Sequence, residues 1–352
     1  MPTAPLVLGL ESSCDDTAAA VLDGSGRILA SVVSSQLAAH RPWGGVVPEI
    51  ASREHLASWP LVAAELTART GLDPAAADLV AATRGPGLVG SLLVGLSLGK
   101  ALAYGGGKPF YAIHHLAGHL VSPFLRPDGG PADPVPARFV GLVLSGGHSC
   151  LFAVENGAVT TLAETRDDAI GEAFDKVGKR LGLPYPQGPV VDRLAERGDP
   201  RRFDLPVPRR GEDPYFSFSG LKSATIRQLE ALERDGLTFD PADPPASILD
   251  LAASFRHAAV GQVLDRVDAL HEERPVPVLA VSGGVAANRE LRRRLAEWSS
   301  HRGVDTRLVP LSLAGDNAAM IAFAALLRHR RGEVSDPWSI EAASRSPLDR
   351  GA

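Results

Sequence analysis

The feature that most constrains this chain is a repeated pattern in which a short apolar run ends abruptly in a polar or glycine-rich turn. Three such runs stand out: residues 6–10 before ESSCDDT, residues 139–144 before SGG, and residues 276–281 before SGG. Short apolar runs bounded by turns are typical of buried strands. Helical periodicity separates them, at residues 50–70, at residues 90–104 and through most of residues 168–268. The sequence therefore predicts an α/β fold.

A stretch rich in Pro, Gly and Asp divides the chain. Residues 126–138 are typical of a linker, and the strand-rich region on each side of it has polar loops at its strand ends. A chain of 352 residues is long enough for two domains. Ligands of α/β folds bind at strand ends, so we expect two α/β domains facing a cleft. The same Ser-Gly-Gly turn occurs at residues 145–147 and 282–284, which is a weak sign of an internal repeat.

Composition narrows the class of protein. Two cysteines, Cys14 and Cys150, cannot form a disulfide framework. The first residues lack the basic and apolar regions of a signal peptide. No uncharged apolar run approaches the length of a membrane span. We therefore expect a cytoplasmic protein with no membrane partner.

The charge balance leaves one question open. A net charge of −5 argues against nucleic-acid binding through the overall charge of the protein. Arginine clusters nevertheless occur at residues 201–202, 209–210, 292–294 and 328–331. Each alone is typical of a solvated helix face, and together they could form phosphate contacts.

The segment His114-His115-Leu116-Ala117-Gly118-His119 contains two histidines four residues apart. On a helix, His115 and His119 share a face and can bind one cation. Neutral imidazole suits iron or zinc. Ordinary surface histidines would give the same pattern. Metalloprotease chemistry lacks its glutamate because Leu116 follows His115.

A metal site needs a further ligand, and Asp316 is the best candidate. It lies in Ala314-Gly315-Asp316-Asn317, directly before an apolar helix expected to run to about Arg328. A helix N-cap is the competing interpretation, since aspartate favours that position. From the residues alone, the N-cap interpretation is the stronger one.

Three turns carry the remaining candidate chemistry. The two Ser-Gly-Gly turns could cradle a phosphate or nucleoside with backbone N–H groups, or be simple tight turns. Asp15 and Asp16, in the first polar turn, could hold a cation or orient a water, or lie in a solvated turn. A stretch from Gly95 to Lys100 only superficially resembles a phosphate loop, and its glycines fit close helix packing better.

Together these motifs resemble the TsaD family, tRNA threonylcarbamoyltransferase subunits formerly called glycoprotein endopeptidases. The resemblance spans nearly the whole chain. The matching stretches are LGLESSCDDTAAAV, SSQLAAHRPWGGVVPEIASREH, TRGPGLVGSLLVGLSLGKALA, AIHHLAGHL, LVLSGGHS, GEAFDKVGKRLGLPYPQGP, VSGGVAANRELR and GDNAAMIA. The histidine in SGGHS resembles the bacterial branch. The resemblance implies two actin-like, sugar-kinase-like domains around a nucleotide cleft, one of residues 1–130 with 318–352 and one of residues 131–317 with helical insertions.

The resemblance also implies a reaction: transfer of the threonylcarbamoyl group from threonylcarbamoyl-AMP to the 6-amino group of adenosine 37 in tRNAs that read ANN codons, with release of AMP. It implies metal ligands at His115, His119 and Asp316, with Fe(2+) favoured over Zn(2+), and activity-bearing carboxylates at Asp15 and Asp16. The implied adenylate contacts are Val143, Leu144, Ser145, Gly146, Gly147, Asp175, Gly188, Asp192 and Asn288. The implied partners are tRNA, a paralogous TsaB-type subunit and a small TsaE-type ATPase.

The sequence departs from the family pattern at five positions: Trp43 stands for tyrosine, Asp16 for glutamate, Gln187 for glycine, and Gly315 and Ala318 flank Asp316-Asn317 in place of threonine and glycine. None of these removes an implied metal ligand. A bulky Gln187 is unfavourable if that position needs a positive φ. The alternatives to the transferase are a small-molecule kinase or ATPase of the same superfamily, an actin- or chaperone-like binding module, and the older endopeptidase assignment.

Overall fold

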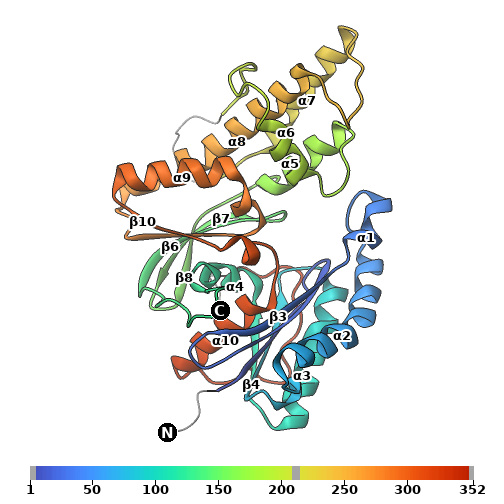
Figure 1. Cartoon of the computed structure of the whole chain (residues 1–352). Coiled ribbons are helices and arrows are strands. Elements are labelled where there is room, and N and C mark those ends of the chain that lie inside the picture. The colour runs from blue at the N-terminus through green and yellow to red at the C-terminus, as the bar shows by residue number, and fades with distance from the viewer. Residues whose placement is uncertain (1–4, 208–214, 349–352) are drawn as a thin grey trace. The chain divides into compact units, whose positions relative to one another are not determined.

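The computed structural model describes residues 5–207 and 215–348. Its contacts divide the chain into two compact units. Unit 1 comprises Met1–Ala137, Gly157–Val159 and Val309–Ala352, and unit 2 comprises Arg138–Asn156 and Thr160–Leu308. Each unit is built around one mixed five-stranded sheet with helices packed on it, so the α/β prediction is confirmed (Figure 1).

The sheet of unit 1 has the order β3-β2-β1-β4-β5. Its strands are β1 (Val7–Glu11), β2 (Asp16–Leu22), β3 (Ile28–Ser35), β4 (Leu79–Gly85) and β5 (Phe110–His114). The first three strands form antiparallel pairs, and β4 and β5 run parallel to β1. The carboxyl ends of β1, β4 and β5 therefore meet at one edge, where Glu11 and His114 lie.

Helices cover both faces of this sheet. They are α1 (Leu37–His40), α2 (Pro48–Thr70), α3 (Val89–Gly106), α4 (His115–Val121) and α10 (Ala318–Arg330), with short 3-10 turns at Arg41–Trp43, Pro74–Ala76, Ser122–Phe124 and Leu311–Leu313. Alternate residues of β1 face opposite sides. Gly9 faces α10, where an added Cβ would lie 2.4 Å from the carbonyl oxygen of Ala318. Leu8 and Leu10 face α2 and α3, which pack side by side (Figure 1).

Glycines allow α3 to approach its neighbours closely. A Cβ on Gly95 would lie 2.3 Å from the Ser12 hydroxyl, and one on Gly99 would lie 3.0 Å from the Ala82 side chain. The packing interpretation of these glycines is therefore confirmed. By length and composition alone α3 is apolar enough to cross a membrane, yet here it packs against β4 and α2.

Unit 2 repeats the strand order of unit 1. Its sheet is β10-β9-β6-β7-β8, with β6 (Arg138–Leu144), β7 (Ser149–Glu155), β8 (Ala158–Glu164), β9 (Val278–Ser282) and β10 (Asp305–Leu308). An antiparallel β6–β7 pair is followed by parallel β9 and β10, as β1–β2 is followed by β4 and β5. The helices are α5 (Ile170–Arg180), α6 (Gln187–Ala195), α7 (Ser219–Arg234), α8 (Ala246–Glu273) and α9 (Arg289–Arg302), with a 3-10 turn at Gly284–Ala287.

The two Ser-Gly-Gly turns both belong to this second sheet. They follow β6 and β9, which are parallel neighbours with Val143 opposite Ser282. Gly283 has a φ of 89°, and a Cβ there would lie 2.3 Å from the Leu144 carbonyl oxygen. The two similar Ser-Gly-Gly turns therefore follow adjacent strands of one sheet. What the two units share is the order and direction of their strands.

Candidate metal centre and nucleotide-binding residues

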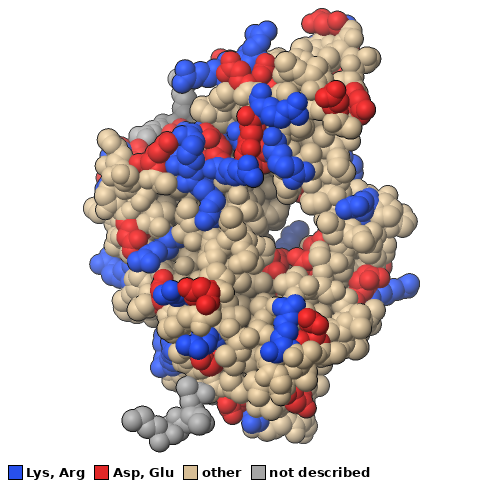
Figure 2. Space-filling view, in the orientation of Figure 1, with Lys and Arg blue, Asp and Glu red and all other residues tan. Residues whose placement is uncertain are grey.

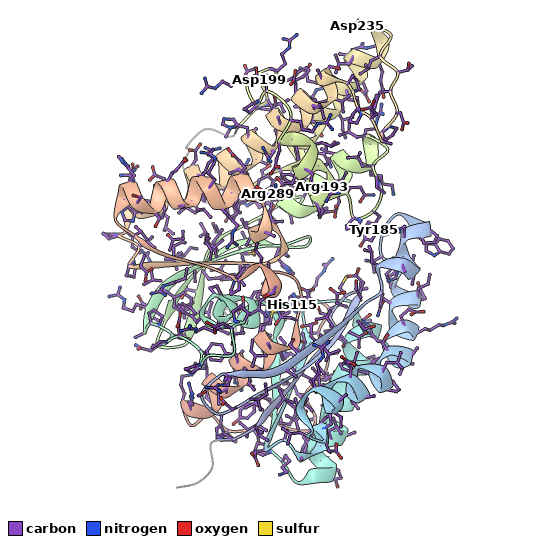
Figure 3. The ribbon with its side chains drawn as sticks, viewed as in Figure 1. His115, Tyr185, Arg193, Asp199, Asp235 and Arg289 are labelled. Carbon is purple, nitrogen blue, oxygen red and sulfur yellow. The ribbon has the colours of Figure 1, made fainter. Side chains whose placement is uncertain are left out.

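His115 and His119 lie on the same face of α4, one turn apart, and both are buried. Figure 3 labels His115. Their ring centroids are 4.7 Å apart, with the ring planes nearly perpendicular. Asp316, in the loop before α10, brings its Oδ1 within 3.5 Å of His115 Nε2 and 3.2 Å of His119 Nε2. One ligand atom from each of the three residues lies within 4.8 Å of the others. The structure thus brings together the three predicted metal ligands.

The N-cap of α10 is Asn317, not Asp316. The Asn317 side-chain oxygen accepts a hydrogen bond from the Met320 N–H at 3.0 Å. The Asn317 amide also donates to the carbonyl oxygens of Leu313 and Gly315, which fixes the loop. The N-cap interpretation of Asp316 was therefore wrong, and its carboxylate faces the imidazoles instead.

Glu11, at the end of β1, is fully buried behind His115. Its Oε2 lies 3.1 Å from His115 Nδ1 and also accepts the Thr83 hydroxyl at 2.6 Å. Its Oε1 accepts the Ser13 N–H. Burial by itself would raise the pKa of Glu11, but the positive charge of a protonated His115 outweighs it and the pKa is lowered. Sequence reasoning did not select Glu11, although its place directly after a buried strand was a signal.

The arrangement of nitrogen atoms fits a cation. Metal-bound histidines commonly donate their second ring N–H to a carboxylate, as His115 can do to Glu11, which leaves its Nε2 for a metal. His119 Nδ1 is buried and has no hydrogen-bond partner among the described residues. Without a metal, burial lowers the pKa of His115, but Asp316 and Glu11 outweigh burial and raise it to about 9. Two imidazoles and a carboxylate form a ligand set that Fe(2+) and Zn(2+) both accept.

Asp15 lies in the turn between β1 and β2, and Asp16 begins β2, on the same unit as the histidines. Burial raises the pKa of Asp16 to about 7, and the negative charges of Asp15, Asp316 and Glu11 add to it against a hydrogen bond from Ser35. Asp16 therefore lies within electrostatic reach of Asp15, Glu11 and Asp316, the last of which is a predicted metal ligand.

His55 of α2 holds this turn from behind. Its side chain is fully buried, with Nε2 3.0 Å from the Cys14 carbonyl oxygen and Nδ1 2.7 Å from the Thr17 hydroxyl. Burial lowers the pKa of His55 and favours its neutral form. A neutral imidazole can donate to the carbonyl and accept from the hydroxyl, so His55 fixes both sides of the acidic turn.

In unit 2, the predicted adenylate contacts Val143 and Leu144 end β6, and Ser145 begins the glycine turn. The Ser145 hydroxyl accepts hydrogen bonds from the N–H groups of Gly147 and His148 at 3.3 and 3.1 Å. A Cβ on Gly146 or Gly147 would meet nothing within 4 Å, so this turn is open to a ligand. The start of α5 packs against its other side, where a Cβ on Gly171 would lie 2.6 Å from the Ser145 carbonyl oxygen.

The other predicted adenylate contacts are joined through side chains of α5, α6 and α9. The Asp175 carboxylate accepts the Gly188 N–H at 2.7 Å, and the Asp192 carboxylate accepts the Asn288 amide at 2.7 Å. Gln187 is the first residue of α6 and is buried. Its φ is not positive, so a glutamine fits the backbone at this position without strain.

The chain is similar to curated proteins over nearly its full length. Residues 27–323 match the TsaD family, described as tRNA N6-adenosine threonylcarbamoyltransferase. A relative of that name from Cyanothece sp. is 47% identical, with 96% of each chain covered. Another from Thermus thermophilus is 44% identical over 97% of this chain and 99% of the relative.

Solved structures of low sequence identity share the fold. The crystal structure of T. kodakarensis HypF is 14% identical with a TM-score of 0.61, covering 94% of this chain and 48% of that one. The activator of 2-hydroxyisocaproyl-CoA dehydratase from Clostridium difficile is 14% identical with a TM-score of 0.51, covering 95% of this chain and 100% of that one. These likenesses show the fold, an α/β fold of the actin-like and sugar-kinase-like type. Its family match and its relatives show that the chain belongs to the TsaD family.

Proposed function

We propose that this chain transfers the threonylcarbamoyl group from threonylcarbamoyl-AMP to the exocyclic 6-amino group of adenosine 37, next to the anticodon of tRNAs that read ANN codons. The relatives carry the name of this transferase. The observation that carries the proposal is the cluster of His115, His119 and Asp316, with Asp15 and Asp16 beside it. A small-molecule kinase of the same superfamily would not need this cluster.

We further propose that His115, His119 and Asp316 hold one divalent cation per chain, Fe(2+) in preference to Zn(2+). Two histidines and one carboxylate are the ligand set of many non-haem Fe(II) sites with open positions. A bound cation would supply Lewis acidity, neutralising phosphate charge and polarising a carbonyl group. Glu11 keeps the His115 ring in the orientation that exposes Nε2.

The chemistry of transfer needs a proton acceptor. The 6-amino nitrogen bonds to the carbamoyl carbon, the bond from that carbon to the phosphate oxygen breaks, and AMP leaves with the electron pair. The nitrogen loses one proton in this step. We assign the catalytic role to Asp15 and Asp16, because carboxylates beside the cluster can accept that proton and orient the amine.

The residues of unit 2 are proposed to bind the adenylate half of the donor: Val143, Leu144, Ser145, Gly146, Gly147, Asp175, Gly188, Asp192 and Asn288. The open glycine turn can offer N–H groups to the phosphate. The Asp192–Asn288 pair can bind ribose hydroxyls or the base edge. We propose that units 1 and 2 are the two actin-like domains. Their main boundaries then lie after Ala137 and after Leu308, and not after the expected residues 130 and 317.

We also propose that the protein works in the cytoplasm with a paralogous TsaB-type subunit and a small TsaE-type ATPase. Unit 1 offers an apolar docking surface for the first of these. A groove of about 800 Å³ between α2 and α3 is lined by Leu56, Trp59, Leu93 and Leu98, among others. Leu61, on the same helix as Leu56, is 71% exposed. Exposed apolar surface of this kind is typical of a protein interface.

The direct experiment supplies the purified chain and its two partner proteins with threonylcarbamoyl-AMP and unmodified tRNA. Nucleosides from the digested tRNA are then separated and identified by mass spectrometry. We expect threonylcarbamoyladenosine, and none from a tRNA in which guanosine replaces adenosine 37. No product, together with rapid phosphorylation of a sugar or acetate, would favour the kinase alternative.

The metal site has its own experiment. The double variant His115→Ala, His119→Ala is expected to lose bound iron or zinc by elemental analysis. His257→Ala, His301→Ala is a matched control, because both histidines belong to unit 2 and the three ligands belong to unit 1. Full metal occupancy in the first variant would show that the ligand assignment is wrong.

A further inference from the structure

Four exposed arginines lie on one helix and in the loop after it. Arg193 lies in α6, Arg197 follows its end, and Arg201 and Arg202 lie four and five residues further on. All four are exposed, and none makes an ion pair within residues 5–207 and 215–348. Many other arginines of unit 2 are paired, as Arg180 is with Glu233. Exposed arginines that follow one another within ten residues and make no ion pair raise the local positive potential, which attracts an anion.

The backbone that carries these arginines is held rigidly. Arg256 of α8 donates to the carbonyl oxygens of Asp192 and Ala195 and so fixes the end of α6. In the following loop, the Asp199 N–H donates to the Asp250 carboxylate and the Phe203 N–H donates to the Ser254 hydroxyl. A rigid support lowers the entropy that ordering a long side chain on a ligand would cost.

A fifth unpaired arginine joins them from α9. One guanidinium nitrogen of Arg294 donates to the His257 carbonyl oxygen, and Arg294 has no ion pair within the described ranges. Burial lowers the pKa of His257, and Arg294, Arg201 and Arg293 lower it further against the nearby Glu290. Arg294 of α9 and Arg201 of the loop after α6 thus both lie within electrostatic reach of His257, whose Nδ1 is also 4.0 Å from Glu290 Oε1.

The same helices carry residues assigned above to the adenylate. Asp192 lies in α6 one residue before Arg193, and Asn288 immediately precedes Arg289 at the start of α9 (Figure 3). Arg289 also pairs with Glu196, which ties the two helix ends together. Figure 2 shows Lys and Arg gathered over α9, with acidic residues among them. An anion bound here would therefore lie beside the donor site of unit 2.

We propose that Arg193, Arg197, Arg201, Arg202 and Arg294, together the α6–α9 face, bind the sugar-phosphate backbone of the tRNA next to the adenylate residues. This rests on the proposed function. Guanidinium groups match phosphate geometry in bidentate contacts. The chain carries a net charge of −5, so a concentrated basic face is a local property and not a general one. Phosphate contacts position a nucleic acid without reading its sequence.

The test measures binding of fluorescein-labelled unmodified tRNA by anisotropy over a range of salt concentrations. The variant Arg197→Glu, Arg201→Glu is expected to bind at least about tenfold more weakly, because two charged hydrogen bonds are lost. The slope of log affinity against log salt should fall by about 1.5, the share of two phosphate contacts. Arg197→Gln, Arg201→Gln should give a smaller loss of affinity.

The control is Arg27→Glu, Arg69→Glu in unit 1, which makes the same change in net charge at exposed, ion-paired arginines. Equal weakening in the control would overturn the α6–α9 face as the binding site. So would an unchanged affinity and salt slope in the first variant, provided that its metal content and thermal midpoint equal those of the wild type. A wild-type chain that neither binds nor modifies tRNA would instead refute the proposed function. Competition by an acidic peptide as effective as unlabelled tRNA would overturn the RNA assignment in favour of an acidic protein.

Discussion

Glu11 is a buried carboxylate that holds three neighbouring groups in place through hydrogen bonds. It contacts the ring of His115, the hydroxyl of Thr83 and the N–H of Ser13. Carboxylates that orient a metal-binding histidine typically contribute about 10- to 100-fold to metal affinity. At the scale of single residues, Glu11 is therefore a positioning residue for the proposed cation.

The variant Glu11→Ala is expected to retain metal about 10- to 100-fold less tightly, because the His115 ring loses the acceptor that orients it. Metal content is measured by elemental analysis after dialysis against graded concentrations of a chelator. Glu65→Ala, at an exposed carboxylate on α2, is the control. Equal retention by both variants would contradict the positioning role.

Asp167 caps α7 from a distant part of the chain. Its carboxylate accepts the Phe218 and Ser219 N–H groups and the hydroxyls of Ser217 and Ser219. Burial alone would raise the pKa of Asp167, but these hydrogen bonds outweigh it and lower the pKa below its ordinary value. A carboxylate with a lowered pKa stabilises the fold above its unfolded pKa and loses that contribution as pH falls through the folded value.

Asp167→Ala should therefore lower the free energy of unfolding at pH 7 by about 1 kcal/mol, the usual contribution of a helix cap. The deficit should shrink as pH falls below about 4, the ordinary pKa of aspartate, because the wild type also loses its charged cap there. Urea denaturation of both proteins across this pH range provides the measurement. A deficit independent of pH would show that the charge of Asp167 does not matter.

Among the elements, the segment after α10 protects the outer edge of the unit 1 sheet. The Asp336 N–H donates to the Phe110 carbonyl oxygen, and its carboxylate accepts the Ala112 N–H and the Arg328 guanidinium. Further on, His114 Nε2 donates to the Ser346 carbonyl oxygen at 2.8 Å. The open edge of β5 is thus covered, as exposed edges usually must be.

Asp336→Ala is expected to destabilise the protein by about 2 kcal/mol, because the Ala112 N–H and Arg328 lose an acceptor in a partly buried place. Asp305→Ala, whose partner Arg307 lies on the surface, should cost about 0.5 kcal/mol or less. Thermal and urea unfolding compare the two variants. Similar small losses in both would mean that this segment contributes little to the edge.

The sequence predicts the arrangement of side chains well in α4 but not in the loop before α10. The His115–His119 spacing needs only local helix geometry, so the pair could be predicted. Asp316 and Asn317 both suit an N-cap, and local propensity does not choose between them. The choice depends on Asn317 bonding Leu313 and Gly315. Gln187 is a second case in which local sequence did not settle the backbone conformation. The family pattern left open whether this position needs a positive φ, and in the structure Gln187 is the first residue of helix α6.

On the scale of the whole molecule, the two units share a strand order but differ in what they expose. Unit 1 presents leucines around the groove between α2 and α3, with Leu56 64% and Leu93 50% exposed. Unit 2 carries the unpaired arginines of the α6–α9 face. A protein partner and an RNA therefore have chemically distinct surfaces available, one on each unit.

Leu56→Asp is expected to weaken association with the TsaB-type subunit by about tenfold or more, since a charge would be buried in an apolar interface. The folded monomer should be unaffected because Leu56 is 64% exposed. Val334→Asp, at a site 85% exposed and outside the groove, is the control. Analytical ultracentrifugation of each variant with the partner gives the readout, and undiminished association of Leu56→Asp would exclude this part of α2 from the interface.

By itself the sequence determined the α/β class, the buried strands with their polar turns, and the helix that sets His115 beside His119, because each depends on near neighbours in the chain. Tertiary structure decided which distant groups complete these local features. Glu11 reaches His115 across 104 positions, and Asp316 reaches His119 across 197. It also decided that Arg180 pairs with the distant Glu233, while Arg197 and Arg201 make no ion pair among the described residues. Such pairings depend on how strands and helices pack in space, which spacing along the chain does not encode.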